Sequence, residues 1–170
     1  MTLPQFRTVQ ILIFFSAIGL MAMALFFEHV MGLVPCPLCI SQRIVVVTIG
    51  LIGLAAAIHN PGKTGKQGYS AAMVVVALCG AALAIRQLYL EGMPPELAPA
   101  CLPGLDYLVE VMPIMDLIAV MVSGTGDCTE VQWTLFGISI PGWTLVCFIG
   151  YIALGIFETV RAQQSVKLWS

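Results

Sequence analysis

The sequence predicts an all-α membrane protein, a four-helix transmembrane bundle with two outer loops. Two observations lead to this prediction. The chain is 59% hydrophobic and 9% charged, whereas a soluble globular domain carries about 25% charged residues. The apolar residues also gather into four runs that can each supply the roughly 20 residues that a helix needs to cross a bilayer. With 170 residues, we expect a single integral membrane domain over residues 1–170.

The four predicted spans cover residues 9–27, 40–58, 69–90 and 140–157. In the first span, residues 22–24 have the small-x-small pattern of a signal-peptide cleavage site. The apolar run continues beyond them, so we expect a retained span and not a cleaved signal peptide. The second is short, but its helix can begin at Pro37 because proline suits the first turn of a helix. Residues 59–62 end it with turn-forming Pro and Gly. Lys63 and Lys66 then fall in an expected polar linker.

Four spans place both termini on one side of the membrane. Lys and Arg are enriched in cytoplasmic loops and tails, and five basic residues fall on the side of the termini: Arg7, Lys63, Lys66, Arg161 and Lys167. We therefore expect cytoplasmic termini and outer loops at about 28–39 and 91–139. The net charge of −2 and the scattered basic residues argue against a nucleic-acid partner.

The second outer loop contains a further apolar run, residues 105–122, interrupted near its middle by Glu110, Pro113 and Asp116. An Asp at the centre of a spanning helix costs about 2.5–3.5 kcal/mol on the insertion scale. We therefore expect a short, broken amphipathic helix on the membrane surface, with its apolar face toward lipid. The alternative, a fifth span, would place Cys128 across the membrane from Cys101.

Cys36 and Cys39 stand at the start of the second predicted span with two residues between them. Such a pair can close a small disulfide, and the N-terminus of a helix favours the thiolate form of a cysteine. Arg43 follows Cys39 by four positions, so a helix would place its charge on the same face as the second sulfur. Alternatively, Arg43 only extends to the membrane interface.

The other four cysteines divide into two pairs. Cys79 and Cys147 lie in the middle of apolar runs, where we expect small buried hydrophobic residues. Cys101 and Cys128 lie in the second outer loop, where they can form a disulfide. That disulfide is either a structural staple, worth roughly 3–4 kcal/mol in the chain-entropy model, or a partner in thiol exchange with the first pair. A four-thiolate zinc site is less favoured, since its ligands usually come in closely spaced pairs. We therefore expect no metal.

The order of these motifs resembles the bacterial disulfide bond formation protein B (DsbB) family. The similar segments are residues 27–31, residues 35–39 with the Cys-x-x-Cys at 36–39, Arg43, residues 126–133 and residues 141–143. The resemblance covers nearly the whole chain. It implies a multi-pass protein of the bacterial inner (cytoplasmic) membrane with both termini in the cytoplasm.

The resemblance further implies an enzyme, a protein-disulfide oxidase and quinone reductase that reoxidises DsbA, a dithiol oxidase of the periplasm. By position, Cys101 would form the mixed disulfide with DsbA and Cys128 would be its partner. Cys128 would then exchange with Cys36, which frees Cys39 to face a bound quinone. The electrons would pass to the membrane quinone pool, as ubiquinone or menaquinone.

The quinone contacts implied by the resemblance are Arg43, Ile140 and Trp143, together with Cys39. Arg43 would stabilise the thiolate and the negative charge on the quinone oxygen, and the other two would form an apolar wall. Two positions depart from the family pattern. Gly92 stands where family members carry a histidine, so no role of that histidine transfers. Ile140 stands where a methionine is familiar.

Two alternatives remain open from the sequence. The chain could be a structural four-helix membrane protein whose disulfides only brace its loops. It could also be a membrane oxidoreductase that reduces a quinone epoxide, but there the active dithiol comes late in the bundle, and here it opens the second span.

Overall fold

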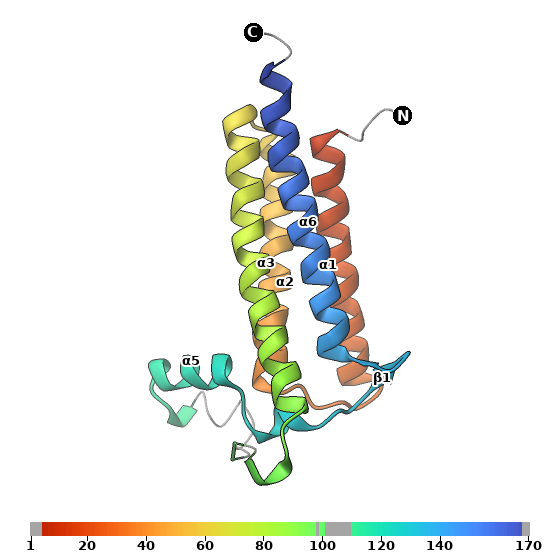
Figure 1. The fold of residues 1–170 in the computed structure, drawn as a ribbon, viewed down its shortest axis with the longest axis vertical. Helices are drawn as coiled ribbons and strands as arrows, with labels where there is room; N and C mark the ends of the chain where they lie inside the picture. The colour runs from red at the N-terminus through yellow and green to blue at the C-terminus, as the bar shows by residue number, and fades with distance from the viewer. Residues whose placement is uncertain (1–4, 98, 101–109, 168–170) are drawn as a thin grey trace.

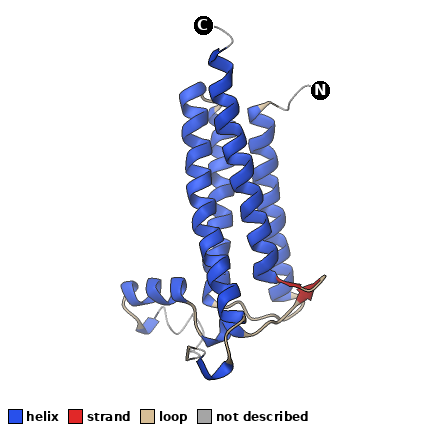
Figure 2. Ribbon diagram, viewed as in Figure 1, coloured by secondary structure: helices blue, strands red, loops and turns tan. Residues whose placement is uncertain are grey.

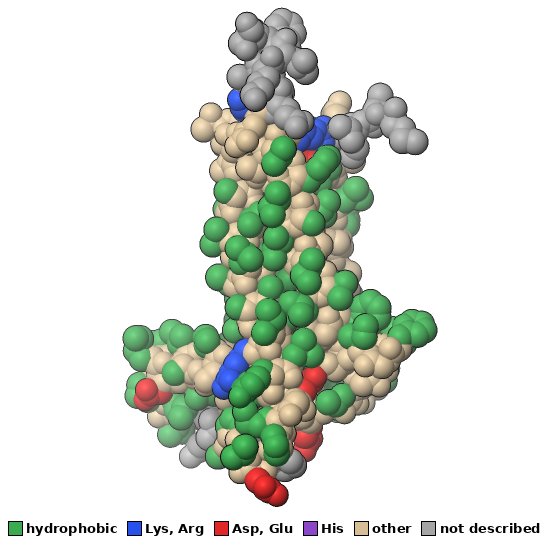
Figure 3. All heavy atoms as spheres, viewed as in Figure 1, with side chains coloured by type: hydrophobic (Ala, Val, Ile, Leu, Met, Phe, Trp, Pro, Cys, Tyr) green, Lys and Arg blue, Asp and Glu red, His purple; other side chains and the backbone are tan. Residues whose placement is uncertain are grey.

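Four long helices form an upright bundle in the computed structural model, which describes residues 5–97, 99–100 and 110–167 (Figure 1). They are α1 (Phe6–His29), α2 (Pro37–His59), α3 (Lys63–Glu91) and α6 (Ile140–Lys167). Each is long and apolar enough to cross a membrane. Hydrophobic side chains cover the visible face along the length of the bundle (Figure 3). The predicted fold class is confirmed, and the chain is a multi-pass membrane protein.

The helices extend beyond the apolar runs that predicted them. The predicted polar linker is wrong, because Lys63 and Lys66 belong to the first turns of α3. Helix α2 ends at His59, and its C-cap residue Asn60 has a left-handed backbone (φ 39°). Pro61 follows, and α3 begins directly after Gly62. No proline follows in residues 63–90, so nothing prevents the helix from starting before the apolar run.

The bundle is assembled from three packed helix pairs, α1 with α2, α2 with α3, and α3 with α6. Glycines allow two of these close approaches. A Cβ atom on Gly80 of α3 would lie 2.5 Å from the Phe148 ring of α6, and a Cβ on Gly50 of α2 would lie 2.9 Å from the Cβ of Ala17. Small residues at these positions let the helix backbones approach as membrane helices commonly do.

The connecting elements gather at the end of the bundle opposite the first turn of α1 and the last turns of α6 (Figures 1 and 2). They are the short 3-10 helices η1 (Pro95–Leu97) and η2 (Gly126–Thr129), helix α5 (Ile114–Ser123), and strands β1 (Thr134–Leu135) and β2 (Ile138–Ser139). The strands form an antiparallel hairpin with Thr134 opposite Ser139. Its turn residues, Phe136 and Gly137, both have positive φ, as two-residue hairpin turns require.

Helix α5 lies in the run that could have formed a fifth span. Part of that run, residues 105–109, lies outside the described residues. Pro113 caps the start of α5, and none of the ten residues of this helix is buried. Two hydrogen bonds attach its C-terminal end to the bundle, from Ser41 Oγ to the Met121 carbonyl (2.8 Å) and from Arg86 Nε to the Ser123 carbonyl (3.1 Å). Its position on a membrane surface stays a prediction.

Candidate redox site

The Cys-x-x-Cys pair stands at the start of α2, as predicted. Cys36 is the N-cap residue and Pro37 is the first residue of the helix. The turn that follows brings the two sulfur atoms together, 3.1 Å apart, with Cys36 as the donor. Both cysteines are free thiols in this structure. The local sequence therefore holds a dithiol that can close a disulfide with little change in the backbone.

Cys128 belongs to the same buried cluster, although it comes from η2. Cys128 is 1% exposed and Cys36 is 5% exposed, and they pack together with Leu38 and Leu90. Gly124 makes this approach possible. Its φ is +79°, and an added Cβ would lie 2.7 Å from side-chain atoms of both leucines. A larger residue at this position would push η2 away from the start of α2.

The neighbouring thiols of Cys36 and Cys128 have pKa values shifted in opposite directions. Hydrogen bonding from Cys36 lowers the pKa of Cys128 to about 6, with help from the Thr125 backbone. The same contact with Cys128, together with Cys39 and burial, raises the pKa of Cys36. At neutral pH the proton therefore stays on Cys36 and Cys128 is a thiolate, the form that attacks disulfides.

Gln87 of α3 also contacts the dithiol. Its amide nitrogen lies 3.2 Å from the Cys39 sulfur and 3.5 Å from the Cys36 sulfur. Its amide oxygen accepts a 2.7 Å hydrogen bond from Nε2 of Gln42 on α2. Both glutamines are 4% exposed. The sequence reasoning missed them, although an amide inside an apolar run is a signal, since buried polar groups in a membrane require partners.

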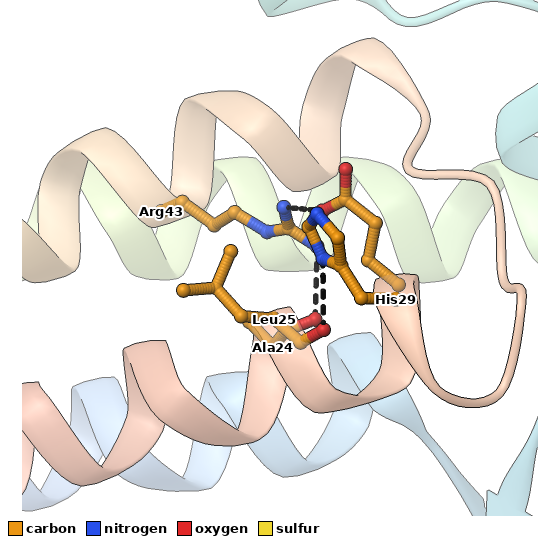
Figure 4. Close-up of polar contacts among 5 residues, drawn as sticks. Ala24, Leu25, His29 and Arg43 are labelled. Carbon is orange, nitrogen blue, oxygen red and sulfur yellow. Dashed lines mark hydrogen bonds and ion pairs between the residues drawn. The ribbon is translucent and has the colours of Figure 1, made fainter.

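Arg43 reaches from α2 to the last turns of α1 (Figure 4). Its guanidinium forms an ion pair with Glu28 and donates a 3.3 Å hydrogen bond to the Ala24 carbonyl. The expectation was that Arg43 would face the sulfur of Cys39. Both residues do line one cavity, but the hydrogen bonds found for Arg43 in the described part of the chain run to α1.

That cavity lies beside the dithiol and has a volume of about 170 Å³. Its walls are mainly apolar and come from α1, α2, α6 and the loop before α2. Ile140 and Trp143, the apolar contacts implied by the resemblance, both line it. The polar groups at its surface include Cys39, Gln42, Arg43 and Gln87. The cavity can therefore hold an apolar molecule that needs a few hydrogen-bond donors.

The remaining cysteines are placed as follows. Cys101 lies outside the described residues, but its neighbour Ala100 accepts a 3.3 Å hydrogen bond from the Gly126 backbone, two positions before Cys128. Cys147 is half-buried and lines the cavity. Cys79 is exposed on α3, so the expectation of a buried Cys79 is wrong. The reason is that an apolar run cannot show which of its faces meets protein and which meets lipid.

The chain matches the family model described as "Disulfide bond formation protein DsbB" over residues 6–157. It is 50% identical over 155 residues to disulfide bond formation protein B of Hahella chejuensis, covering 91% of this chain and 94% of that protein. It is 44% identical to the Stutzerimonas stutzeri protein of the same name, over 95% of this chain and 99% of that protein. With disulfide bond formation protein B 1 of Pseudomonas aeruginosa the identity is 43%, with the same coverage. The chain therefore belongs to the DsbB family of disulfide bond formation proteins.

Proposed function

We propose that this protein is a membrane thiol:quinone oxidoreductase that reoxidises a DsbA-like thiol oxidase and passes the electrons to a quinone. The observation that carries the proposal is the position of Cys36. Its sulfur contacts both Cys128 and Cys39, and Cys39 lines the apolar cavity. This arrangement gives electrons a path from the water-exposed loops to a lipid-soluble acceptor.

The first exchanges take place at the loop pair. A thiolate of the reduced partner attacks the Cys101 sulfur of a Cys101–Cys128 disulfide, and Cys128 leaves as a thiolate. The partner's second thiol then displaces Cys101, and the partner leaves with its own disulfide closed. The hydrogen bond between Ala100 and Gly126 supports this pairing, because it holds the residue before Cys101 close to η2.

The next exchanges move the electrons inward. The Cys128 thiolate attacks Cys36 of a Cys36–Cys39 disulfide, a Cys36–Cys128 bond forms and Cys39 leaves as a thiolate. Cys101 then attacks Cys128, which restores the loop disulfide and releases Cys36. The hydrogen bonds from the Thr125 and Leu38 backbone, which do not need the Cys36 thiol, also lower the pKa of Cys128 and favour the thiolate that attacks. The net result is a reduced Cys36/Cys39 pair that holds two electrons and two protons.

The cavity has the chemistry that a quinone ring requires. Its walls are apolar, and the donors Arg43 and Gln42 line it together with Cys39. A quinone held there would supply the final acceptor for the two electrons and two protons of the Cys36/Cys39 pair. Arg43 would orient a carbonyl oxygen and stabilise negative charge there, and Ile140 and Trp143 would exclude water. Ubiquinone and menaquinone both meet these requirements.

The distribution of charge supports the orientation in a bacterial inner membrane. Arg7, Lys63, Lys66 and Arg161 line one hollow at the end of the bundle where α1 begins and α6 ends. Basic residues favour the cytoplasmic side, so the termini would be cytoplasmic. The dithiol and the loops would then face the periplasm, where a DsbA-like partner can reach them.

Quinone-dependent turnover tests the proposal. The purified protein in detergent, given reduced DsbA and either quinone, should oxidise DsbA and consume one quinone per disulfide formed. Cys39→Ser should abolish both the oxidation of DsbA and the consumption of quinone, because it removes the sulfur beside the cavity. Oxidation of DsbA that neither needs quinone nor responds to Cys39→Ser would contradict the proposal. The structural alternative predicts no turnover at all.

A further inference from the structure

The amide of Gln87 contacts the reacting sulfurs, and nothing in the exchange steps uses it. We propose that Gln87 is a catalytic residue that stabilises the Cys39 thiolate by hydrogen bonding, and that Gln42 is the positioning residue that aims its amide. The inference rests on the proposed function in one respect, because only there is the Cys39 thiolate an intermediate of the reaction. The contact itself is independent of partner and quinone.

The geometry allows only one useful orientation of the Gln87 amide. A glutamine side chain has a donor end and an acceptor end. The donor end of Gln42 meets Oε1 of Gln87 at 2.7 Å, which leaves Nε2 of Gln87 directed at the two sulfurs, 3.2 Å and 3.5 Å away. In the reversed orientation the amide oxygen would face the sulfurs and would repel a thiolate.

Gln87 matters most after Cys36 has formed its bond with Cys128. In the dithiol state, Cys39 receives a hydrogen bond from the Cys36 thiol as well as from Gln87. Once Cys36 is part of a disulfide, its S–H is gone. Since the guanidinium of Arg43 is bonded to Glu28 and Ala24, Gln87 is then the side-chain donor found on Cys39 within the described part of the chain.

Burial makes this contact strong. Gln87 and Gln42 are both 4% exposed, so bulk solvent has little access to the amide. Hydrogen bonds to an ionised group in such a setting are about twice as strong as bonds between neutral groups. An amide also keeps its donor at every pH at which the protein is folded. Gln87 can therefore support the thiolate throughout the pH range of activity.

The test follows the reactivity of Cys39 in a Cys36→Ala background, which removes the competing thiol donor. Iodoacetamide labelling of Cys39 is measured against pH by mass spectrometry of the labelled peptide. Gln87→Met keeps the length of the side chain but has no donor. It should move the labelling profile to higher pH and slow labelling about tenfold on the rising part of the curve, the effect of losing one charge-assisted hydrogen bond. Gln87→Glu keeps the size of the side chain and, where its carboxyl is ionised, places a negative charge beside the sulfurs, so it should shift the profile at least as far.

Gln10→Met is the matched control. Gln10 is fully buried on α1 and its amide has no hydrogen-bond partner among the described residues, so the same substitution there should leave the profile unchanged. Gln42→Met should shift the profile in the same direction as Gln87→Met but less, because the amide of Gln87 becomes free to rotate. An unchanged profile with Gln87→Met, or an equal shift with Gln10→Met, would overturn the assignment.

Turnover separates this inference from the proposed function. Under the inference, Gln87→Met lowers kcat with quinone in the otherwise unchanged protein, whereas Gln10→Met does not. If the labelling profile shifts as expected but the unsubstituted protein fails to reduce quinone, the proposed function is wrong and the hydrogen-bonding role of Gln87 stands. If the unsubstituted protein turns over and Gln87→Met changes neither kcat nor the profile, only the role of Gln87 is wrong.

Discussion

The buried sulfur of Cys128 lies beside that of Cys36, although the two residues come from different loops of the chain. One residue opens a spanning helix and the other sits in a 3-10 turn that follows α5. Their contact brings η2, which lies in the outer loop, against the Cys36/Cys39 dithiol beside the cavity.

The reactivity of Cys128 should depend on its neighbour. In the reduced protein, labelling of Cys128 by a small neutral alkylating agent should have a midpoint near pH 6, the value to which Cys36 and the backbone lower its pKa. The thiolate is the reactive form, so labelling should be fast above pH 6 and should fall below it. Peptide-resolved mass spectrometry between pH 4.5 and 9 gives the profile.

Cys36→Ala provides the comparison for this profile. It removes the hydrogen bond that is the largest cause of the lowered pKa, so the midpoint for Cys128 should rise toward the ordinary range of a cysteine, near 8.5. A Cys128 midpoint near 8.5 in the unsubstituted protein would mean that the two sulfurs are not neighbours in solution.

Gly124 should be essential for seating η2 on the bundle. Gly124→Val combines strain at a positive φ with contacts to Leu38 and Leu90 that leave no room for a side chain. We expect a loss of about 1–3 kcal/mol of stability and slower exchange between Cys128 and Cys36. Thermal unfolding in detergent and quinone-linked turnover measure the two effects.

Gly137→Val is the matched control for Gly124. Gly137 has the same φ of +79°, but nothing lies within 4 Å of an added Cβ. The control carries the backbone strain without the clash, so turnover should change little. Equal losses in both variants would show that strain, and not the seating of η2, explains the effect of Gly124.

Arg43 should contribute mainly to quinone binding. Arg43→Met removes the cation that lines the cavity but keeps most of the apolar stem. We expect the KM for quinone to rise about tenfold, the loss of one hydrogen bond to a charged donor, with a smaller change in the KM for DsbA. Steady-state kinetics with each substrate varied in turn distinguish these two effects.

Two further variants sharpen the Arg43 prediction. Glu28→Gln releases Arg43 from its ion pair, so the KM for quinone should stay the same or fall. Arg7→Met removes an exposed cation at the opposite end of the bundle and should leave kinetics unchanged. A normal KM for quinone in Arg43→Met would remove Arg43 from the quinone site.

Much of the architecture follows from local sequence patterns. Apolar runs predict the four spans because membrane insertion depends on the transfer free energies of the residues summed over a single segment. The proline after Cys36 predicts the start of α2 because it acts within one turn. In the described part of the run around Pro113, α5 has ten residues, fewer than a membrane span needs, in keeping with the charges there. Each of these inferences needs only neighbouring residues.

The contacts of the site depend on which helix faces meet, and the sequence does not contain that information in local form. Gln87 lies on α3, and only the packing of α2 against α3 brings it to Cys39. Arg43 was expected near sulfur from its spacing on one helix, but Glu28 on α1 binds it. Cys79 was expected to be buried, yet its face of α3 is exposed.

The most direct test of the account is the formation of a Cys36–Cys128 disulfide. In a Cys39→Ser/Cys101→Ser variant, both natural partners are absent, and mild oxidation with diamide should join Cys36 to Cys128 rapidly and nearly completely, as seen in the mass of the cross-linked peptide. The Cys36→Ser/Cys101→Ser variant, which leaves Cys39 and Cys128, should cross-link more slowly. Failure of Cys36 and Cys128 to form this bond, with both thiols still open to maleimide after oxidation, would contradict the account.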